Sequence, residues 1–312
     1  MFARSAQAAR RTLAGRYGGT SVSEAKSSGN GSGRGFLARH HFLFRRLHSL
    51  TGIVPIGVFL IAHLTTNSSI LWGKFAGHAP QETGVLGGGA HYFQEEVHWI
   101  HTGIPHLLLI EITLWVSIAF HAGLGFIYAK SGRSNTSRYA YQDNWRYTLQ
   151  RWSGYIGIIF IFYHVATLRW GWTFLVPGGT EWDHNFAAST LAAALQGGYD
   201  GFTMAGLLVA ALYFTGVTLL VFHFANGLWT AAITWGLTIS EQAQRRWGAV
   251  CFVLGAGLMV AGWSSVVGFL LLDPAEAEEV ERTLLNEREA PAASEPAQPA
   301  ARIENADPVE QP

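Results

Sequence analysis

Charged residues are scarce in this sequence, and their scarcity limits the class of protein. Asp, Glu, Lys and Arg make up 13% of the 312 residues, whereas soluble domains carry about 25%. Hydrophobic residues make up 49%, and the mean hydropathy is +0.18. The formal net charge is zero, so the chain lacks the basic surplus typical of nucleic-acid-binding domains. We therefore expect a protein that contacts membrane lipid and has no nucleic-acid partner.

Cysteine is almost absent. The single cysteine, Cys251, lies in an apolar run. One thiol excludes an internal disulfide and any metal site or iron–sulfur cluster held by several thiolates of this chain. We interpret Cys251 as a small buried residue. The chain also has no dinucleotide-binding fingerprint, so we do not expect it to hold a flavin or nicotinamide itself.

The two ends of the chain lack long apolar runs. Residues 1–36 are rich in Arg, Ser and Gly and have no apolar core of a secretory signal. We predict a disordered cytoplasmic tail there, with an organelle transit peptide as the alternative. Residues 273–312 are rich in Ala, Pro and Glu, which predicts an acidic tail outside the membrane with a short helix at 275–288. Residues 37–272 are predicted to form one transmembrane domain.

Five apolar stretches fill this central region, each near the ~20 residues that a membrane-spanning helix needs. They cover about 44–66, 104–129, 152–173, 203–231 and 247–272. We predict an all-α integral membrane protein with five transmembrane helices and a local kink at Pro55.

Basic residues alternate between the two sides of these helices. Lys and Arg gather in 1–48, in 130–151 and at Arg245 and Arg246, and they are sparse in the other connections. The positive-inside rule therefore places the N-terminus in the cytoplasm and the C-terminus outside.

Four of the five stretches each carry one histidine, namely His63, His121, His164 and His223. A rise of ~1.5 Å per residue places His63 and His164 in the outer half of the membrane, and His121 and His223 in the inner half. Two neutral imidazoles at one depth on different helices suit the axial positions of a six-coordinate haem. The pattern thus predicts a di-haem four-helix bundle with a fifth peripheral helix. Satisfied core histidines are the alternative, and the carboxylates or clustered ligands of a zinc or di-iron site are missing.

Glu111 is an ionisable residue within the second stretch, about 15 Å further out than His121. An acid at such a depth is a functional-site hypothesis by default, and a neutral, hydrogen-bonded structural group is the alternative. Near the outer mouth of the same helix, His98, His101 and His106 are candidates for relaying protons.

Basic residues at the helix ends are candidates for binding haem propionates. Arg169 lies five residues after His164, at the outer end of the third stretch. Arg45, Arg46 and Ser49 lie at the inner end of the first stretch. Interfacial arginines that extend toward the headgroups are the alternative interpretation.

Three segments carry a resemblance to a known family: "FLFRRLHSLTGIVPIGVFLIAHLTTN", "YQDNWRYTLQRWSGYIGIIFIFYHV" and "FHFANGLWTAAITWGLTIS". Together they resemble the di-haem cytochrome b membrane anchor of type B succinate:quinone oxidoreductases and fumarate reductases, over about residues 36–272. The resemblance implies two b haems, with His63 and His164 on the distal iron and His121 and His223 on the proximal iron. This pairing agrees with the independent argument from depth.

The resemblance also implies partners and a location. They are a flavoprotein subunit with FAD and an iron–sulfur subunit on the cytoplasmic face of a bacterial inner membrane. Electrons from succinate would pass through both haems to a quinone, usually menaquinone in this type. Glu111, His101 and His106 are the candidates for the quinone and proton site. Whether the complex forms a higher oligomer is left open by the resemblance.

One position departs from part of this family. Some quinol-oxidising members carry an acid two positions before the fourth ligand, and this chain has Val221 there. The departure argues against that proton route and leaves the physiological direction open. The alternatives are a di-haem anchor of another quinone-linked oxidoreductase, or a haem-free proton-handling membrane protein.

Overall fold

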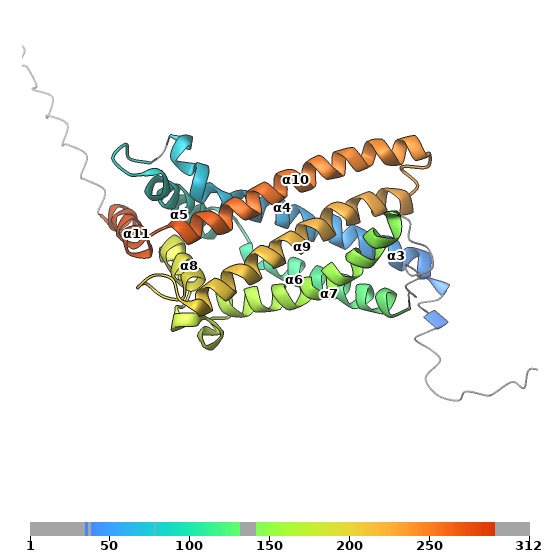
Figure 1. The fold of residues 1–312 in the computed structure, drawn as a ribbon, viewed down its shortest axis with the longest axis horizontal. Helices are drawn as coiled ribbons and strands as arrows, with labels where there is room; N and C mark the ends of the chain where they lie inside the picture. Colours follow the sequence, from blue (N-terminus) through green and yellow to red (C-terminus); the bar gives the residue numbers. More distant parts are fainter. Residues whose placement is uncertain (1–34, 37–38, 78, 132–141, 291–312) are drawn as a thin grey trace, which may run out of the picture. The chain divides into compact units, whose positions relative to one another are not determined.

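The computed structural model describes residues 35–36, 39–77, 79–131 and 142–290 (Figure 1). The chain divides into two compact units, Met1–Leu43 and Phe44–Pro312, and every contact given below lies within the second unit. The predicted tail over 1–36 lies outside the described residues apart from Gly35 and Phe36, as does the end of the predicted C-terminal tail, 291–312.

Helices make up the regular structure of the described residues, in which no strand occurs, so the prediction of an all-α protein is confirmed. The α-helices are α3 (His41–Ile53), α4 (Pro55–Trp72), α5 (Val85–Gly103), α6 (Leu107–Ser131), α7 (Gln142–Leu168), α8 (Ala187–Gln196), α9 (Met204–Thr234), α10 (Glu241–Leu271) and α11 (Pro274–Glu289). Short 3-10 turns are η1 (Gly73–Ala76), η2 (Thr173–Leu175), η3 (Pro177–Gly179) and η4 (His184–Phe186).

Four helical segments of the described chain are long and apolar enough to cross a membrane. They are His41–Ala76, Leu107–Lys130, Met204–Thr234 and Glu241–Leu271. These segments contain most of four predicted spans. The remaining prediction, 152–173, lies largely in α7, which is helical as far as Leu168 and is followed by irregular structure. The protein is thus a multi-pass helical membrane protein.

The predicted kink at Pro55 is present as a break between α3 and α4. Proline has no N–H group to donate, and it fits the first turn of a helix, where that group has no partner. The chain nevertheless stays continuous at the break, because the Val54 N–H still donates to the carbonyl of Leu50 at 2.8 Å. The two helices therefore belong to one apolar segment, His41–Ala76.

The long helices pack in the order α4, α10, α9, α7 and α6, and α6 returns to α4 (Figure 1). An apolar cluster of Leu64, Val221 and Leu258 joins α4, α9 and α10. Gly262 permits close approach of α10 to α9, because a Cβ there would lie 2.5 Å from Val217 Cγ1. The helices α4, α6, α7 and α9 each bring one of the four predicted histidines into the bundle.

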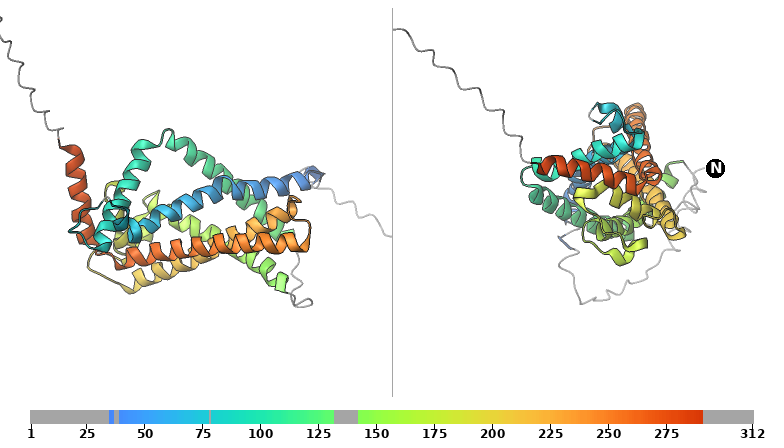
Figure 2. Two further views of the ribbon diagram at one scale, coloured as in Figure 1. Left: turned by 90° about the horizontal axis from the view of Figure 1, so that it is seen from above. Right: turned by 90° about the vertical axis from the view of Figure 1, so that its left-hand side faces the viewer.

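Three further helices, α5, α8 and α11, pack together at one end of the long helices, and we call this group the cap (Figures 1 and 2). Small side chains allow the close packing, since Ala187, Ala188, Ala192 and Ala277 are fully buried. Figure 2 shows that α5 and α6 meet at a sharp corner, where His106 adopts a positive φ of 60°.

Glu281 is a fully buried carboxylate on α11 that links this helix to α8. Its oxygens accept hydrogen bonds from the N–H groups of Ala188 at 2.6 Å and Ser189 at 3.3 Å, and from Ser189 Oγ at 2.5 Å. A carboxylate at these amides satisfies donors at the first turn of α8, which the helix itself cannot satisfy. The short helix predicted at 275–288 is therefore present, and it packs into the fold. Burial raises the pKa of Glu281 to about 7.

Candidate functional site

The first histidine pair lies between α4 and α7. The ring centroids of His63 and His164 are 5.7 Å apart, and the ring planes are at 81°. Each imidazole stacks on a phenylalanine one turn earlier in its own helix: Phe59 lies 5.3 Å from His63, and Phe160 lies 5.9 Å from His164. The pair that the sequence matched by depth is thus brought together among aromatic side chains.

The second pair lies between α6 and α9. The ring centroids of His121 and His223 are 6.1 Å apart, and their planes are at 80°. Glycines stand against both rings. A Cβ on Gly52 would lie 2.5 Å from His121 Cε1, and a Cβ on Gly154 would lie 3.1 Å from His223 Cε1. Glycine at these two positions therefore gives the imidazoles their room.

The Nδ1 atoms of all four imidazoles face polar atoms outside the pairs. For His121 and His223 these atoms are backbone carbonyl oxygens, which only accept, so their Nδ1 carries the proton and donates. The lone pair is then on Nε2, the arrangement that metal-bound histidines adopt. The Nδ1 contacts are His48 O at 2.8 Å for His121, Gln150 O at 3.1 Å for His223, Tyr213 Oη at 3.3 Å for His164 and Asn67 Nδ2 at 3.4 Å for His63.

Both pairs have a spacing that suits one metal ion between two imidazoles. Metal–imidazole bonds of ~2 Å place the ring centres of two opposed axial ligands roughly 6 Å apart. The measured separations of 5.7 Å and 6.1 Å agree with this value. In the part of the chain that the structure describes, no three His, Cys, Asp or Glu side chains converge as a clustered metal site requires. The donor chemistry therefore fits a haem iron in each pair better than a zinc or di-iron centre.

His48 was not among the candidates predicted from the sequence, yet it neighbours the second pair. The imidazole of His48 stacks on that of His121, with centroids 4.0 Å apart and planes at 12°. Its Nδ1 is buried and has no hydrogen-bond partner among the described residues. The available signal was the spacing of four residues between His48 and Gly52, which places both on one face of α3.

Glu111 and Arg169 form a bidentate ion pair between the start of α6 and the chain just after α7. Arg169 Nε donates to Glu111 Oε1 at 2.9 Å, and an Nη donates to Oε2 at 3.1 Å. Arg169 was predicted as a candidate for binding a haem propionate, and in the structure its guanidinium pairs with this carboxylate. Such two-point pairing fixes orientation as well as charge.

Two of the three predicted quinone and proton candidates line one cavity of about 840 Å³. Glu111 and His101 are among its lining residues, and Arg169 joins them. His106 is not among them, since it forms the corner between α5 and α6. The half-buried His98 on α5 is not among them either. Residues of α5, α6 and α11 and of the segments around α7 and α8 enclose the cavity.

The wall of this cavity carries further titratable groups. The imidazoles of His101 and His184 stack with centroids 5.0 Å apart. Carboxylates of Glu181, Asp183 and Glu278 line the same space. A polar cavity that contains an ion pair and two imidazoles can hold a polar ring and exchange protons with it.

The predicted propionate candidates on α3 meet the end of α9. Trp235 Nε1 donates to Ser49 Oγ at 2.8 Å, and Ser49 Oγ donates to the carbonyl of Arg46 at 2.9 Å. The Arg46 guanidinium lies 5.5 Å from the centroid of the Trp235 ring. Arg45 is exposed. Arg46 and Ser49 therefore form one group with Trp235, and Arg45 stands apart from it.

Comparison with curated proteins gives one informative relative. The chain is 31% identical over 230 residues to the succinate dehydrogenase cytochrome b558 subunit of Bacillus subtilis (strain 168). The alignment covers 73% of this chain and 97% of that relative. No family model matches the chain.

Proposed function

Because the chain belongs to the family of the succinate dehydrogenase cytochrome b558 subunit, we propose that it carries two b haems and passes electrons to a membrane quinone. His63 and His164 hold one iron, and His121 and His223 hold the other. One observation carries this proposal: both pairs have the separation of opposed axial imidazoles. When bound, a b haem supplies a one-electron carrier. The chain supplies its ligands, the Nδ1-protonated tautomer of His121 and His223, and the surrounding packing.

The orientation follows from the distribution of basic residues. The N-terminus lies in the cytoplasm, α7 is a fifth membrane span, and the cap lies outside. A flavoprotein subunit with FAD and an iron–sulfur subunit dock on the cytoplasmic face of the bacterial inner membrane. The His121–His223 pair is then proximal to these partners, and the His63–His164 pair is distal, on the side of the cap. With a haem held by each pair, electrons from succinate would reach the proximal pair before the distal one.

The cavity at Glu111 is the proposed quinone site, with menaquinone the usual quinone of the type that the sequence resembles. Reduction of a quinone to a quinol takes up two electrons and two protons. Glu111 and His101 lie in the cavity wall, where either can pass a proton to a bound quinone oxygen. Arg169 positions the Glu111 carboxylate through its two hydrogen bonds.

Protons for this reaction come from the side of the cap. The alternative route through α9 needs an acid near the proximal pair. The corresponding residue is Val221, 1% exposed and packed in an apolar cluster with Leu64 and Leu258. Electrons that move outward and meet protons taken up outside let the membrane potential assist the reaction, by ~2.3 kcal/mol per charge and 100 mV.

A reduced-minus-oxidised spectrum of the purified complex, with haem extraction, tests the haem sites. We expect b-type bands and two haems per chain. His63→Ala should remove the distal haem and spare the proximal one, and His121→Ala should do the reverse. His91→Ala, on α5, is the matched control and should leave both. Absence of b-type bands would refute the proposal, and loss of the proximal haem alone in His63→Ala would refute the pairing.

A further inference from the structure

A second, smaller cavity lies where α9 turns into α10. Its volume is about 380 Å³. It sits at the end of both Met204–Thr234 and Glu241–Leu271, two segments apolar enough to cross a membrane. This position corresponds to the level of the lipid headgroups, at the opposite end of α10 from the cap (Figure 1). The cavity has no part in either histidine pair or in the cavity at Glu111.

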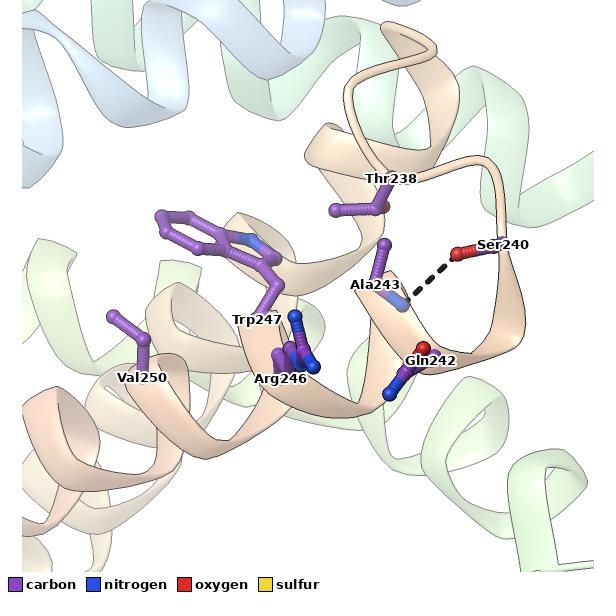
Figure 3. Close-up of a pocket in the computed structure, with 7 residues that line it drawn as sticks. All are labelled: Thr238, Ser240, Gln242, Ala243, Arg246, Trp247 and Val250. Carbon is purple, nitrogen blue, oxygen red and sulfur yellow. Dashed lines mark hydrogen bonds between the residues drawn. The ribbon is translucent and has the colours of Figure 1, made fainter.

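The start of α10 supplies backbone donors to this cavity. Ser240 is the N-cap: its Oγ accepts from the Ala243 N–H at 3.2 Å, and its carbonyl accepts from the Gln244 N–H at 3.0 Å (Figure 3). The N–H groups of Glu241 and Gln242 have no acceptor among the described residues. α10 is 31 residues long, and the N-terminus of such a helix favours an anion through its free N–H groups and its dipole.

A buried hydroxyl independently points to a missing acceptor. Thr238 is 8% exposed and lines the cavity. Its Oγ1 is buried and has no hydrogen-bond partner in the described part of the chain. Figure 3 shows Thr238 across from the first turn of α10, above Ala243 and beside Ser240. A buried hydroxyl without a partner destabilises the fold, so a ligand oxygen that accepts its proton would remove this cost.

Positive charge in the cavity comes from Arg246, which lines it. Arg246 makes no ion pair with any described residue, whereas its neighbour Arg245 binds Glu241 at 2.6 Å. The carboxylate of Glu241 is therefore compensated, and the guanidinium of Arg246 is available. An arginine beside free backbone N–H groups is a combination that recognises phosphate oxygens.

The remaining walls are aromatic and apolar. Trp247 is held at the cavity by its indole N–H, which donates to the carbonyl of Leu228 on α9 at 3.3 Å. From the cavity, exposed Val250, Phe252 and Val253 continue along α10. Tryptophan typically lies at the headgroup level of a membrane protein, and an exposed apolar surface beyond it faces acyl chains. The ligand should therefore combine an anionic head with an apolar tail.

We propose that this cavity binds the phosphate group of an anionic phospholipid. The N–H groups at the start of α10, Thr238 Oγ1 and Arg246 would hold the phosphate oxygens, and the acyl chains would lie along Val250. Basic pockets at the ends of membrane helices recognise lipid headgroups in this way. The site concerns lipid binding alone and stands whether or not the proposed electron transfer is correct.

The test measures phospholipid retained by the complex after it is solubilised from vesicles of phosphatidylcholine and phosphatidylglycerol and washed with detergent. Arg246→Gln should lower the retained phosphatidylglycerol about fivefold, since one arginine near the surface contributes ~1 kcal/mol. Thr238→Val should lower it as well. Lys130→Gln removes one positive charge from the last turn of α6 and should change nothing, and phosphatidylcholine should be equal in all samples. An unchanged melting temperature shows that the variants are folded.

Three results would overturn the proposal. Equal loss of phosphatidylglycerol in Arg246→Gln and Lys130→Gln would reduce the effect to general surface charge. Displacement of the lipid by inorganic phosphate alone would assign the cavity to free phosphate. Release of the soluble subunits from Arg246→Gln, with lipid retention unchanged, would assign Arg246 to a carboxylate of a protein partner.

Discussion

Arg169 holds Glu111 through two hydrogen bonds, at 2.9 Å and 3.1 Å, across 58 residues of sequence. The pair connects the beginning of α6 with the chain that leaves α7. Helix α6 otherwise packs lightly against its neighbours α4 and α7. The ion pair therefore positions the acid in the cavity and also fixes the end of a helix that carries His121.

Glu111→Gln should separate electron transfer from quinone chemistry. The amide keeps hydrogen-bonding capacity but cannot take up and release a proton, so succinate:quinone activity should fall at least 100-fold, within the range for loss of a general acid. Succinate oxidation with a soluble dye and the haem spectrum should stay unchanged. Glu95→Gln, on α5 and absent from the cavity wall, is the control. Full quinone activity in Glu111→Gln would remove this acid from the reaction.

Gly52→Ala should disturb the proximal haem alone. The added Cβ would lie 2.5 Å from His121 Cε1, a distance at which the imidazole must move. We expect loss of that haem or a shifted spectrum, with the distal haem intact. Gly123→Ala on α6 is the control, because its Cβ meets nothing within 4 Å. Redox titration of both variants resolves the two haems, and a normal proximal haem in Gly52→Ala would contradict the placement of His121.

Tyr213→Phe should weaken the distal site. The hydroxyl of Tyr213 lies 3.3 Å from His164 Nδ1, and removing such a partner typically costs 10–100-fold in metal affinity. Haem content at the distal site should fall on detergent washing, while the proximal haem stays bound. Tyr163→Phe deletes a hydroxyl that donates to the carbonyl of Leu175 and should spare both haems. Equal haem retention in the two variants would deny Tyr213 this role.

Glu281 should make the stability of the cap depend on pH. Burial raises its pKa from 4.5 to about 7, so the folded cap binds one proton more than the unfolded chain between these values. Stability should therefore fall as pH rises from about 4.5 to 7, by at most about 3 kcal/mol. Glu281→Gln should abolish this dependence, and Glu279→Gln, at an exposed position, should keep it. Hydrogen exchange in α11 at several pH values measures the stability of the cap. If Glu281→Gln shows the same change of stability with pH as the parent chain, Glu281 is not the group responsible.

The sequence predicted the helical bundle and the pairing of the histidines, because hydropathy and the helical rise are one-dimensional properties. The same reasoning places His63 level with His164 without any knowledge of packing. The break at Pro55 was equally predictable, since it follows from the missing N–H group of proline.

Contacts between distant segments were beyond that reasoning. Arg169 follows His164 by five residues, which suggested a haem propionate, and no local pattern indicates its ion pair with Glu111 on another helix. The carboxylate of Glu281 accepts a hydrogen bond from the start of α8, 92 residues away. No local sequence pattern indicates this contact. His106 was predicted as a proton carrier from its position, and no sequence pattern indicates that its backbone adopts a positive φ at the corner between α5 and α6.

The hydrogen bonds that Glu281 accepts from the start of α8 also determine when the cap can form during biosynthesis. A ribosome delivers α8 long before α11, so the first turn of α8 waits with unsatisfied N–H groups until the last described helix emerges. The cap can close only after α10 has entered the membrane. The cap therefore forms only after α11 has been synthesised. A nascent chain released before α11 would lack the acceptor for the first turn of α8.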